Sequence, residues 1–195
     1  MTVVMQDKDS YLERFSRVEE RVAGRDWAWF QPVRRAALAR FGELGFPTTQ
    51  DEDWRFTSVA PIAHTAFALY ADGGVEPTRR DLDPFGFPGL TCSQLVFVNG
   101  QYSPRLSSIR PLPGGVVVSS LASALTLYPD LIEAHLARYA DFHQDAFTAL
   151  NTAFMEDGAF IRIRRGTVLE EPIHLLYVST ATATPTITHP RNLIV

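Results

Sequence analysis

A dense group of glycine and proline residues at positions 71–91 constrains the fold of this chain more than any other feature. The group comprises Gly73, Gly74, Pro77, Pro84, Gly86, Pro88 and Gly89. Residues of this kind interrupt helices and strands, so the segment is predicted to be a loop or linker. It separates residues 1–70, whose apolar residues recur at helical spacing, from a later part in which short apolar runs alternate with turns. The chain is therefore predicted to be α+β, with an N-terminal helical region.

Two helices are predicted within that N-terminal region. Ser10 followed by Glu13 is a capping-box pattern, in which each side chain satisfies a backbone N–H of the other residue, and Gly24 is predicted to end the helix. The second helix is predicted from Pro32, which suits a first turn, to Gly45, which suits the position after a last turn. The residues predicted to face the core are Leu12, Phe15, Val18 and Val22 in the first helix and Val33, Ala36, Ala37 and Phe41 in the second.

Large aromatic residues bracket the second predicted helix. They are Trp27, Trp29, Phe30 and Trp54. Tryptophans grouped in this way can form a platform for a ligand, or they can anchor a small core. Each indole buries a large apolar area, so we interpret the group as core anchors.

Residues 92–156 are predicted to mix strands and helices. The predicted elements are strands at 94–98 and 116–118 and helices at 120–127, 129–139 and 141–155. Asn99-Gly100 favours a tight turn with positive φ, which predicts a hairpin after the first strand. Ser120 stands at the N-cap position of the first of these helices.

The last segment, residues 157–195, is predicted to consist of short strands separated by turns. These strands are predicted at 160–164, 167–169, 173–178 and 192–195. Such a series is typical of a sandwich, a barrel or a parallel β-helix. Because the sequence stops within an apolar run, we expect the chain to be truncated inside a β-domain. An exposed strand edge would then favour self-association.

The charge balance and the cysteine content limit the classes of protein to which the chain can belong. Lys and Arg number 18 and Asp and Glu 22, a net charge of −4, so a nucleic-acid-binding surface is not predicted. The short basic clusters Arg34-Arg35 and residues 162–165 are interpreted as solvated faces.

No run approaches the ~20 apolar residues that cross a bilayer, and no secretory signal is present, so we predict a cytoplasmic protein without a membrane span. The single cysteine, Cys92, fits a reducing compartment and is interpreted as buried and inert.

No motif in the sequence predicts a catalytic, cofactor-binding or metal-binding residue. Gly-x-Ser-x-Gly, a P-loop and a dinucleotide-binding glycine motif are all missing from the sequence. His143 lies between Asp141 and Asp145, but residues two apart do not share a face of a helix. Glu170-Glu171 is interpreted as a solvated turn, since neighbouring side chains on a strand point to opposite sides. The histidines are His64, His135, His143, His174 and His189, and none forms a paired metal-binding motif.

A set of short segments, in a fixed order, resembles the SufB/SufD family of iron–sulfur cluster assembly scaffold subunits. The segments are GFPT (45–48), EDWRFT (52–57), LVFVNGQY (95–102), LS (106–107), PGGV (113–116), ALNTAF (149–154), DG (157–158), PIHL (172–175) and HPRNLIV (189–195). Each segment alone is weak, but the ordered set is specific and covers nearly the whole chain. The FVNG run favours the SufD branch of the family.

The resemblance implies an N-terminal helical region followed by a right-handed parallel β-helix, of which residues 157–195 would be the first turns. It implies a non-catalytic subunit that pairs with a SufB-like subunit and binds a SufC-like ABC-type ATPase. The complex builds iron–sulfur clusters, and some members bind reduced flavin. We carry no ligand or catalytic role onto this chain, because the family's functional residues would lie beyond Val195. The motif residues Trp54, Arg55, Asn99, Asn151 and Asn192 are interpreted as structural.

Two alternatives remain open at this point. One is a β-helix or barrel enzyme that acts on a small molecule or a sugar, with carboxylates brought together only by the fold; it predicts an acidic or histidine-lined cleft. The other is a protein-binding module whose open sheet edge recruits a strand from a partner.

Overall fold

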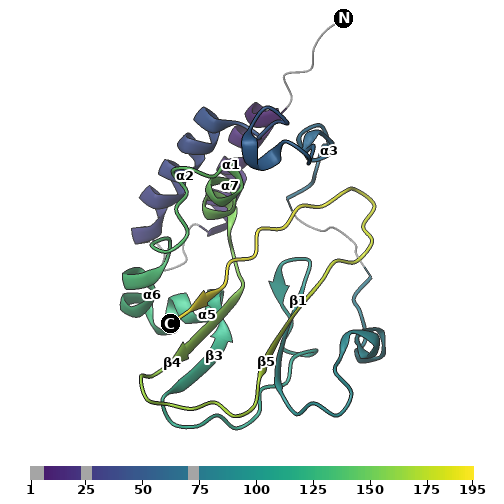
Figure 1. Cartoon of the computed structure of the whole chain (residues 1–195), viewed down its shortest axis with the longest axis vertical. Helices are drawn as coiled ribbons and strands as arrows, with labels where there is room; N and C mark the ends of the chain where they lie inside the picture. The colour runs from purple at the N-terminus through teal and green to yellow at the C-terminus, as the bar shows by residue number, and fades with distance from the viewer. Residues whose placement is uncertain (1–6, 23–27, 70–74) are drawn as a thin grey trace, which may run out of the picture.

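The computed structural model describes residues 7–22, 28–69 and 75–195. Helices α1, α2 and α7 gather at one end of the molecule, and two small sheets occupy the other end (Figure 1). The α+β class is confirmed. None of the helices in these three stretches is long and apolar enough to be a transmembrane span.

The two helices predicted in the N-terminal region are present. Helix α1 spans Asp7–Val22, so it begins before Ser10, and the capping-box prediction placed its start too late. Helix α2 spans Gln31–Leu44, with proline in its first turn. Gly45 adopts φ 67° and its N–H donates to the carbonyl of Phe41 at 2.8 Å, so the predicted stop is confirmed. Gly24 and Trp27 lie outside the described residues.

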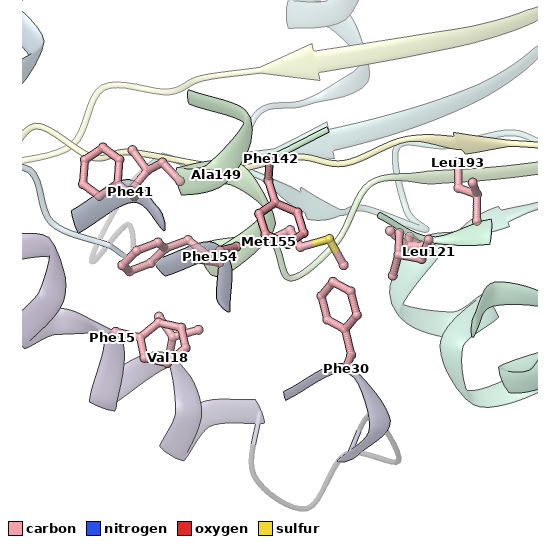
Figure 2. Close-up of a cluster of buried hydrophobic side chains, with 14 of the residues drawn as sticks. Phe15, Val18, Phe30, Phe41, Leu121, Phe142, Ala149, Phe154, Met155 and Leu193 are labelled. Carbon is pink, nitrogen blue, oxygen red and sulfur yellow. The ribbon is translucent and has the colours of Figure 1, made fainter. Parts of the chain in front are cut away.

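One large apolar core joins these helices to helix α7 (Ala146–Phe154). Figure 2 shows Phe15, Phe41 and Phe154 converging from the three helices. The ring of Tyr11 packs edge-on against Phe41 at 5.9 Å and against Phe154 at 6.1 Å between ring centroids. Edge-to-face contacts of this kind add to the stabilisation that burial provides.

The predicted core face of α2 is confirmed in part. Ala37 and Phe41 are fully buried, and Val33 packs against the core. Ala36 is exposed, contrary to the prediction. Arg34 takes its place on the buried face, because positions 34, 37 and 41 share one side of the helix.

Short helices connect the larger elements. They are η1 (Ala28–Phe30), η2 (Glu52–Trp54), α3 (Ala60–Ala63), α4 (Arg79–Leu82), η3 (Asp83–Phe85), α5 (Leu121–Leu127) and α6 (Pro129–His135). The α4–η3 pair lies within the segment predicted to be a loop. A capping box between Thr78 and Asp81 starts α4, and Leu82 packs against Val96 and Leu106.

The tryptophans that the structure describes contact aromatic neighbours. Trp29 packs on Phe30 with ring centroids 5.3 Å apart, and Trp54 packs on Phe147 at 5.2 Å. Both indoles are half-buried. These contacts agree with the interpretation as core anchors.

The first sheet contains the predicted hairpin. Strand β1 (Ser93–Val98) pairs antiparallel with β2 (Gln101–Tyr102), and Asn99 and Gly100 adopt φ 48° and 81° at the turn. Strand β5 (Ile173–Val178) pairs with β1 in parallel along its whole length. The strand order is therefore β2-β1-β5.

The second sheet has the order β3-β4-β6. Strand β3 (Val116–Ser120) pairs antiparallel with β4 (Ala159–Ile163), and β6 (Leu193–Ile194) pairs in parallel with β4. Leu95 and Phe97 of β1 pack against Ala159 of β4, so the two sheets face each other across a small core. The strand predicted at 167–169 is not present in this described part of the chain. Both sheets are small and open, and residues 7–22, 28–69 and 75–195 do not show the predicted right-handed parallel β-helix.

The helices after β3 are shorter than predicted. The Ser120 side chain accepts the N–H of Ser123 at 3.1 Å, which confirms the predicted cap of α5. Helix α6 ends at His135 rather than at residue 139. Helix α7 begins at Ala146 rather than at residue 141, because the Asp141 side chain accepts the N–H of His143 at 2.8 Å and stabilises a turn instead.

Candidate functional site: the junction between helices and sheets

The most highly organised polar region of the described chain is the place where the helical core meets the sheets. We call it the junction and define it as residues 151–158 together with residues 189–192. These two stretches lie side by side, as the bond from the Arg191 N–H to the Asp157 carbonyl at 3.0 Å shows. Both coincide with segments of the ordered motif set, ALNTAF, DG and HPRNLIV. The fold therefore brings together motif residues that are more than thirty positions apart in the sequence.

Asp157 is the centre of the junction. Its side chain is buried and accepts backbone N–H groups from Tyr102 at 3.0 Å, Ala122 at 3.1 Å and Gly158 at 2.8 Å. These donors belong to the β1–β2 hairpin, the start of α5 and the segment before β4. A carboxylate that accepts several backbone N–H groups ties separate segments together. We therefore assign Asp157 a structural role.

Gly158 allows two segments to approach more closely than any other residue would. It adopts φ 155°, and a Cβ placed there would lie 1.9 Å from the carbonyl oxygen of Arg191. Only glycine removes that collision. These contacts explain the DG motif: Asp157 supplies an acceptor carboxylate, and Gly158 allows the close backbone contact.

Two asparagines of the motif set satisfy backbone groups at the junction. The Asn151 side chain donates to the carbonyl of Pro190 at 2.9 Å. The Asn192 side-chain oxygen accepts the N–H of Ala159 at 2.8 Å and the hydroxyl of Tyr177. Burial raises the pKa of the Tyr177 hydroxyl, which keeps it protonated as a donor. The predicted structural role of both asparagines agrees with these contacts.

Asn99, directly after β1, acts in the same way. Its side chain donates to the Thr180 hydroxyl at 2.9 Å and accepts the Thr180 N–H at 3.0 Å. The residue thus sets the hairpin turn, as predicted, and also fixes the chain after β5. Arg55 differs, because it is exposed and lies over the ring of exposed Phe56 at 5.6 Å. Its predicted structural role has no support in these contacts.

Buried Arg34 and half-buried Arg191 serve the junction, and the sequence predicted neither role. Arg34 donates to the carbonyls of Ala153 at 2.7 Å and Met155 at 2.5 Å, at the end of α7. The prediction of a solvated face is therefore wrong for Arg34, because the free carbonyls of a helix end require donors. Arg191 donates to the Thr152 hydroxyl at 2.6 Å, and burial lowers its pKa. The usable signal for Arg34 was its helical spacing with Ala37 and Phe41.

His189 is a half-buried titratable ring at the junction. It stacks on Phe154 with centroids 5.3 Å apart, and its Nε2 is buried without a hydrogen-bond partner among the described residues. Burial lowers the pKa of His189 to about 4, so the ring is neutral at neutral pH. A neutral ring against Phe154 is suited to packing.

The other histidines are dispersed. His64 and His143 are exposed, His135 bonds to Tyr139, and His174 Nδ1 lies 3.0 Å from Gln94 Nε2. Among residues 7–22, 28–69 and 75–195, no three His, Cys, Asp or Glu side chains are grouped as metal ligands. The prediction that the chain carries no catalytic, cofactor-binding or metal-binding residue stays a prediction.

The carboxylates considered from the sequence have other partners. Asp145 caps α7 by accepting the Thr148 N–H at 2.6 Å. Glu171 pairs with Arg110 at 2.8 Å, and Glu170 is exposed. Cys92 is a half-buried free thiol just before β1. The structure thus forms no common site from Asp141, His143 and Asp145. It forms none from Glu170 and Glu171 either.

These features define an α+β protein in which polar motif residues fasten a helical core to a pair of small sheets. The chain belongs to the SufBD family: the family model described as the SufBD protein N-terminal region matches residues 5–175. The ordered motif set had indicated this family, and the match confirms it.

Curated relatives give the same result. An iron–sulfur cluster assembly SufBD family protein from Synechocystis sp. is 32% identical over 162 residues, which is 83% of this chain and 35% of the relative. The SufBD family protein ABCI9 from Arabidopsis thaliana is 35% identical over 75% of this chain and 35% of its own length. The assembly protein SufD from Escherichia coli is 25% identical over 78% of this chain and 32% of its own length. The chain thus spans about a third of the length of these relatives.

Proposed function

We propose that this chain is the N-terminal part of a SufD-like subunit that serves as a non-catalytic scaffold in iron–sulfur cluster assembly. The main support for the proposal is the family match over residues 5–175. The structural contacts of the motif residues agree with it. Asp157, Gly158 and Asn192 are engaged in holding segments together. Motif residues used in this way suit a subunit whose task is to hold a shape.

The proposed continuation of the fold is a right-handed parallel β-helix. The support is the path of the chain, which passes from β4 in one sheet to β5 in the other and back to β6, pairing in parallel with the earlier strand each time. Repetition of such a circuit stacks strands into a solenoid, in which each turn contacts its neighbours. Parallel crossover connections are overwhelmingly right-handed. Strands β5 and β6 would then be the first positions onto which further turns stack.

The proposed partners follow from the family. They are a SufB-like subunit that pairs with the full-length protein and a SufC-like ABC-type ATPase, with the iron–sulfur cluster, and in some members reduced flavin, held by the whole complex. Neither a nucleic acid nor a membrane is a proposed partner. A cytoplasmic location is part of the proposal, and it rests on the low cysteine content. The free edges of β5 and β6 would let the chain alone self-associate.

The test is assembly of the full-length protein with its partners. The full-length subunit is co-expressed with the SufB-like and SufC-like subunits, purified through a tag on the ATPase, and its mass is determined by native mass spectrometry. A ternary complex is the expected result. An ATPase and SufB-like subunit that assemble fully while the SufD-like subunit remains outside would contradict the proposal.

A matched pair of variants tests whether assembly of the complex depends on the junction. Gly158→Ala forces residues 157–158 away from Arg191, whereas Gly114→Ala adds a methyl group where nothing lies within 4 Å. The first variant is expected to reduce recovery of the ternary complex, and the second to leave it unchanged. Equal recovery of both variants would show that assembly does not depend on the junction.

A further inference from the structure

A hollow of about 360 Å³ lies between helix α1 and the segment 66–69. Its lining includes Arg14 and Arg17 of α1, Phe67 and Leu69 of the segment, and Thr184. Among the lining residues that the structure describes, there is no aspartate or glutamate. The hollow therefore has two positive charges in its wall without a carboxylate beside them, although the whole chain has a net charge of −4.

Hydrogen bonds and core packing fix the wall of the hollow opposite α1. The Ala68 N–H donates to the Pro185 carbonyl at 2.7 Å, and the Ile187 N–H donates to the Ala68 carbonyl at 3.0 Å. Leu69 and Ile187 pack against the helical core. This wall is thus formed without a ligand, which lowers the entropic cost of binding one.

Arg14 is held in position and keeps donors free. One of its guanidinium nitrogens donates to the Phe67 carbonyl, and the guanidinium lies over the Tyr11 ring, 5.9 Å from the ring centroid. A guanidinium carries five N–H donors. Arg14 has no second hydrogen bond and no carboxylate partner among the described residues. Its other donors are therefore available to a ligand in the hollow.

Arg17 adds a second cation on the same side of α1, because residues three apart are neighbours on a helix surface. Its side chain is exposed and pairs with no carboxylate in the described part of the chain. Two like charges at this spacing repel each other, and a bound anion would remove that repulsion. Arg35 of α2, by comparison, is already neutralised by Glu19 of α1 at 2.7 Å.

The donors and the size of the hollow indicate the class of ligand. Two guanidinium groups match a phosphate group, which offers three acceptor oxygens and a charge approaching −2. The Thr184 hydroxyl is a further donor, since it makes no hydrogen bond within the described residues. Phe67 and Leu69 supply an apolar lining for an organic group.

The volume of about 360 Å³ falls in the range of small-molecule pockets, about 300–1,000 Å³, and exceeds what an inorganic ion needs. We propose that the hollow binds a small phosphomonoester, with its phosphate against Arg14 and Arg17 and its organic group on Phe67 and Leu69.

The experiment measures binding of phenyl phosphate to the full-length protein by isothermal titration calorimetry, without partner subunits. Arg17→Gln and Arg14→Gln each remove one cation of the hollow. Arg80→Gln is the matched control, because Arg80 is exposed on α4, lies outside the hollow and loses the same charge. Inorganic phosphate and benzoate are titrated for comparison, because the first lacks the organic group and the second lacks the phosphate.

We expect saturable binding of phenyl phosphate that weakens about tenfold in Arg17→Gln and in Arg14→Gln and changes less than about twofold in Arg80→Gln. Inorganic phosphate and benzoate should bind at least about fivefold more weakly than phenyl phosphate. Arg14→Gln also loses the bond to the Phe67 carbonyl. Should that variant fail to fold, Arg17→Gln decides the test, because Arg17 has no hydrogen bond to lose within the described chain.

Three results would overturn the proposal. The first is the absence of saturable binding, and the second is equal weakening in the control and the hollow variants. The third is binding of inorganic phosphate or benzoate as tight as that of phenyl phosphate, because the hollow would then hold an adventitious ion only. The measurement needs no partner subunit, so its outcome is independent of the scaffold proposal.

Discussion

The helical end of the molecule buries one continuous aromatic core, whereas the sheet end buries two small clusters, one on each face of the β1–β5 pair. In the helical core, Tyr11 and Phe15 each contact Phe154 edge-on. At the sheet end, the segments are connected through polar side chains such as Asp157 and Asn99. The helical end therefore derives its stability from buried apolar area, whereas the sheet end depends more on individual hydrogen-bond acceptors and close contacts.

The comparison has a physical consequence for substitutions. A well-packed apolar core tolerates volume-conserving changes at modest cost. A buried polar group with fixed partners tolerates little, because each lost partner leaves a group without a hydrogen bond. Substitutions of Gly158, Arg34, Asp157 and His189 test this contrast.

Gly158→Ala should be the most destabilising single change. The added Cβ would meet the Arg191 carbonyl at 1.9 Å, and the positive φ disfavours a side chain. We expect the free energy of unfolding to fall by about 3–5 kcal/mol, measured by urea denaturation. Gly114→Ala is the control and should change stability by less than about 0.5 kcal/mol. Equal losses of stability in the two variants would show that the close contact at Gly158 is no more important for stability than the loop at Gly114.

Arg34→Met tests the polar contact that lies within the helical end. The variant keeps the apolar stem but leaves the carbonyls of Ala153 and Met155 without their donor. A loss of about 2–4 kcal/mol is expected in thermal or urea unfolding. The neighbouring Arg35→Met is the control, since Arg35 is exposed and pairs with Glu19 at the surface. That control should cost less than about 1 kcal/mol.

Asp157→Asn tests the buried carboxylate that connects segments at the sheet end. The amide keeps one acceptor oxygen but turns an NH₂ group towards one of the backbone N–H groups of Tyr102 and Ala122. A loss of about 1.5–3 kcal/mol is expected. Hydrogen exchange should show faster exchange at Tyr102 and Ala122 than at amides of α2. Uniform acceleration in both regions would mean that the two ends do not respond separately.

His189 gives the smallest expected effect, which depends on pH. Its pKa in the folded state is about 4, below the ordinary value of 6.5. The stabilisation by the neutral ring is therefore fully present above pH 6.5 and is lost as the pH falls from about 6.5 towards about 4. We expect a loss on the order of 1–2 kcal/mol between about pH 7 and pH 5, measured by urea unfolding.

The controls for the pH effect are two variants. His189→Gln should show a flatter dependence in this range, because it removes the titrating ring. His64→Gln, at an exposed position, should retain the dependence of the unsubstituted protein. A dependence that stays the same in His189→Gln would assign it to another group.

Much of the local structure could be predicted from neighbouring residues. Gly45 ends α2, Asn99-Gly100 forms the hairpin turn, and Ser120 caps α5, each by a bond or a φ value that involves residues a few positions apart. The ordered motif set likewise indicated the family. These predictions succeeded because the physical cause lies within a few residues of the pattern.

Other local predictions failed because a short-range polar contact competes with the hydrophobic pattern. The turn at Asp141 delays α7, although the apolar spacing continued across it. Ala36 is exposed because the helix face is set by Arg34, Ala37 and Phe41 together. In both cases a single polar side chain determines the local structure against the hydrophobic pattern.

The α+β class, the main turns and the family of this chain could be predicted from the sequence alone. The folded chain was needed to show that β1 pairs with β5, that Asp157 joins three segments, and that Arg34 is buried against the end of α7. The physical reason is distance along the chain. Helix caps and turns depend on neighbouring residues, whereas strand pairing and the partners of buried polar groups depend on residues that meet only when the whole chain has folded.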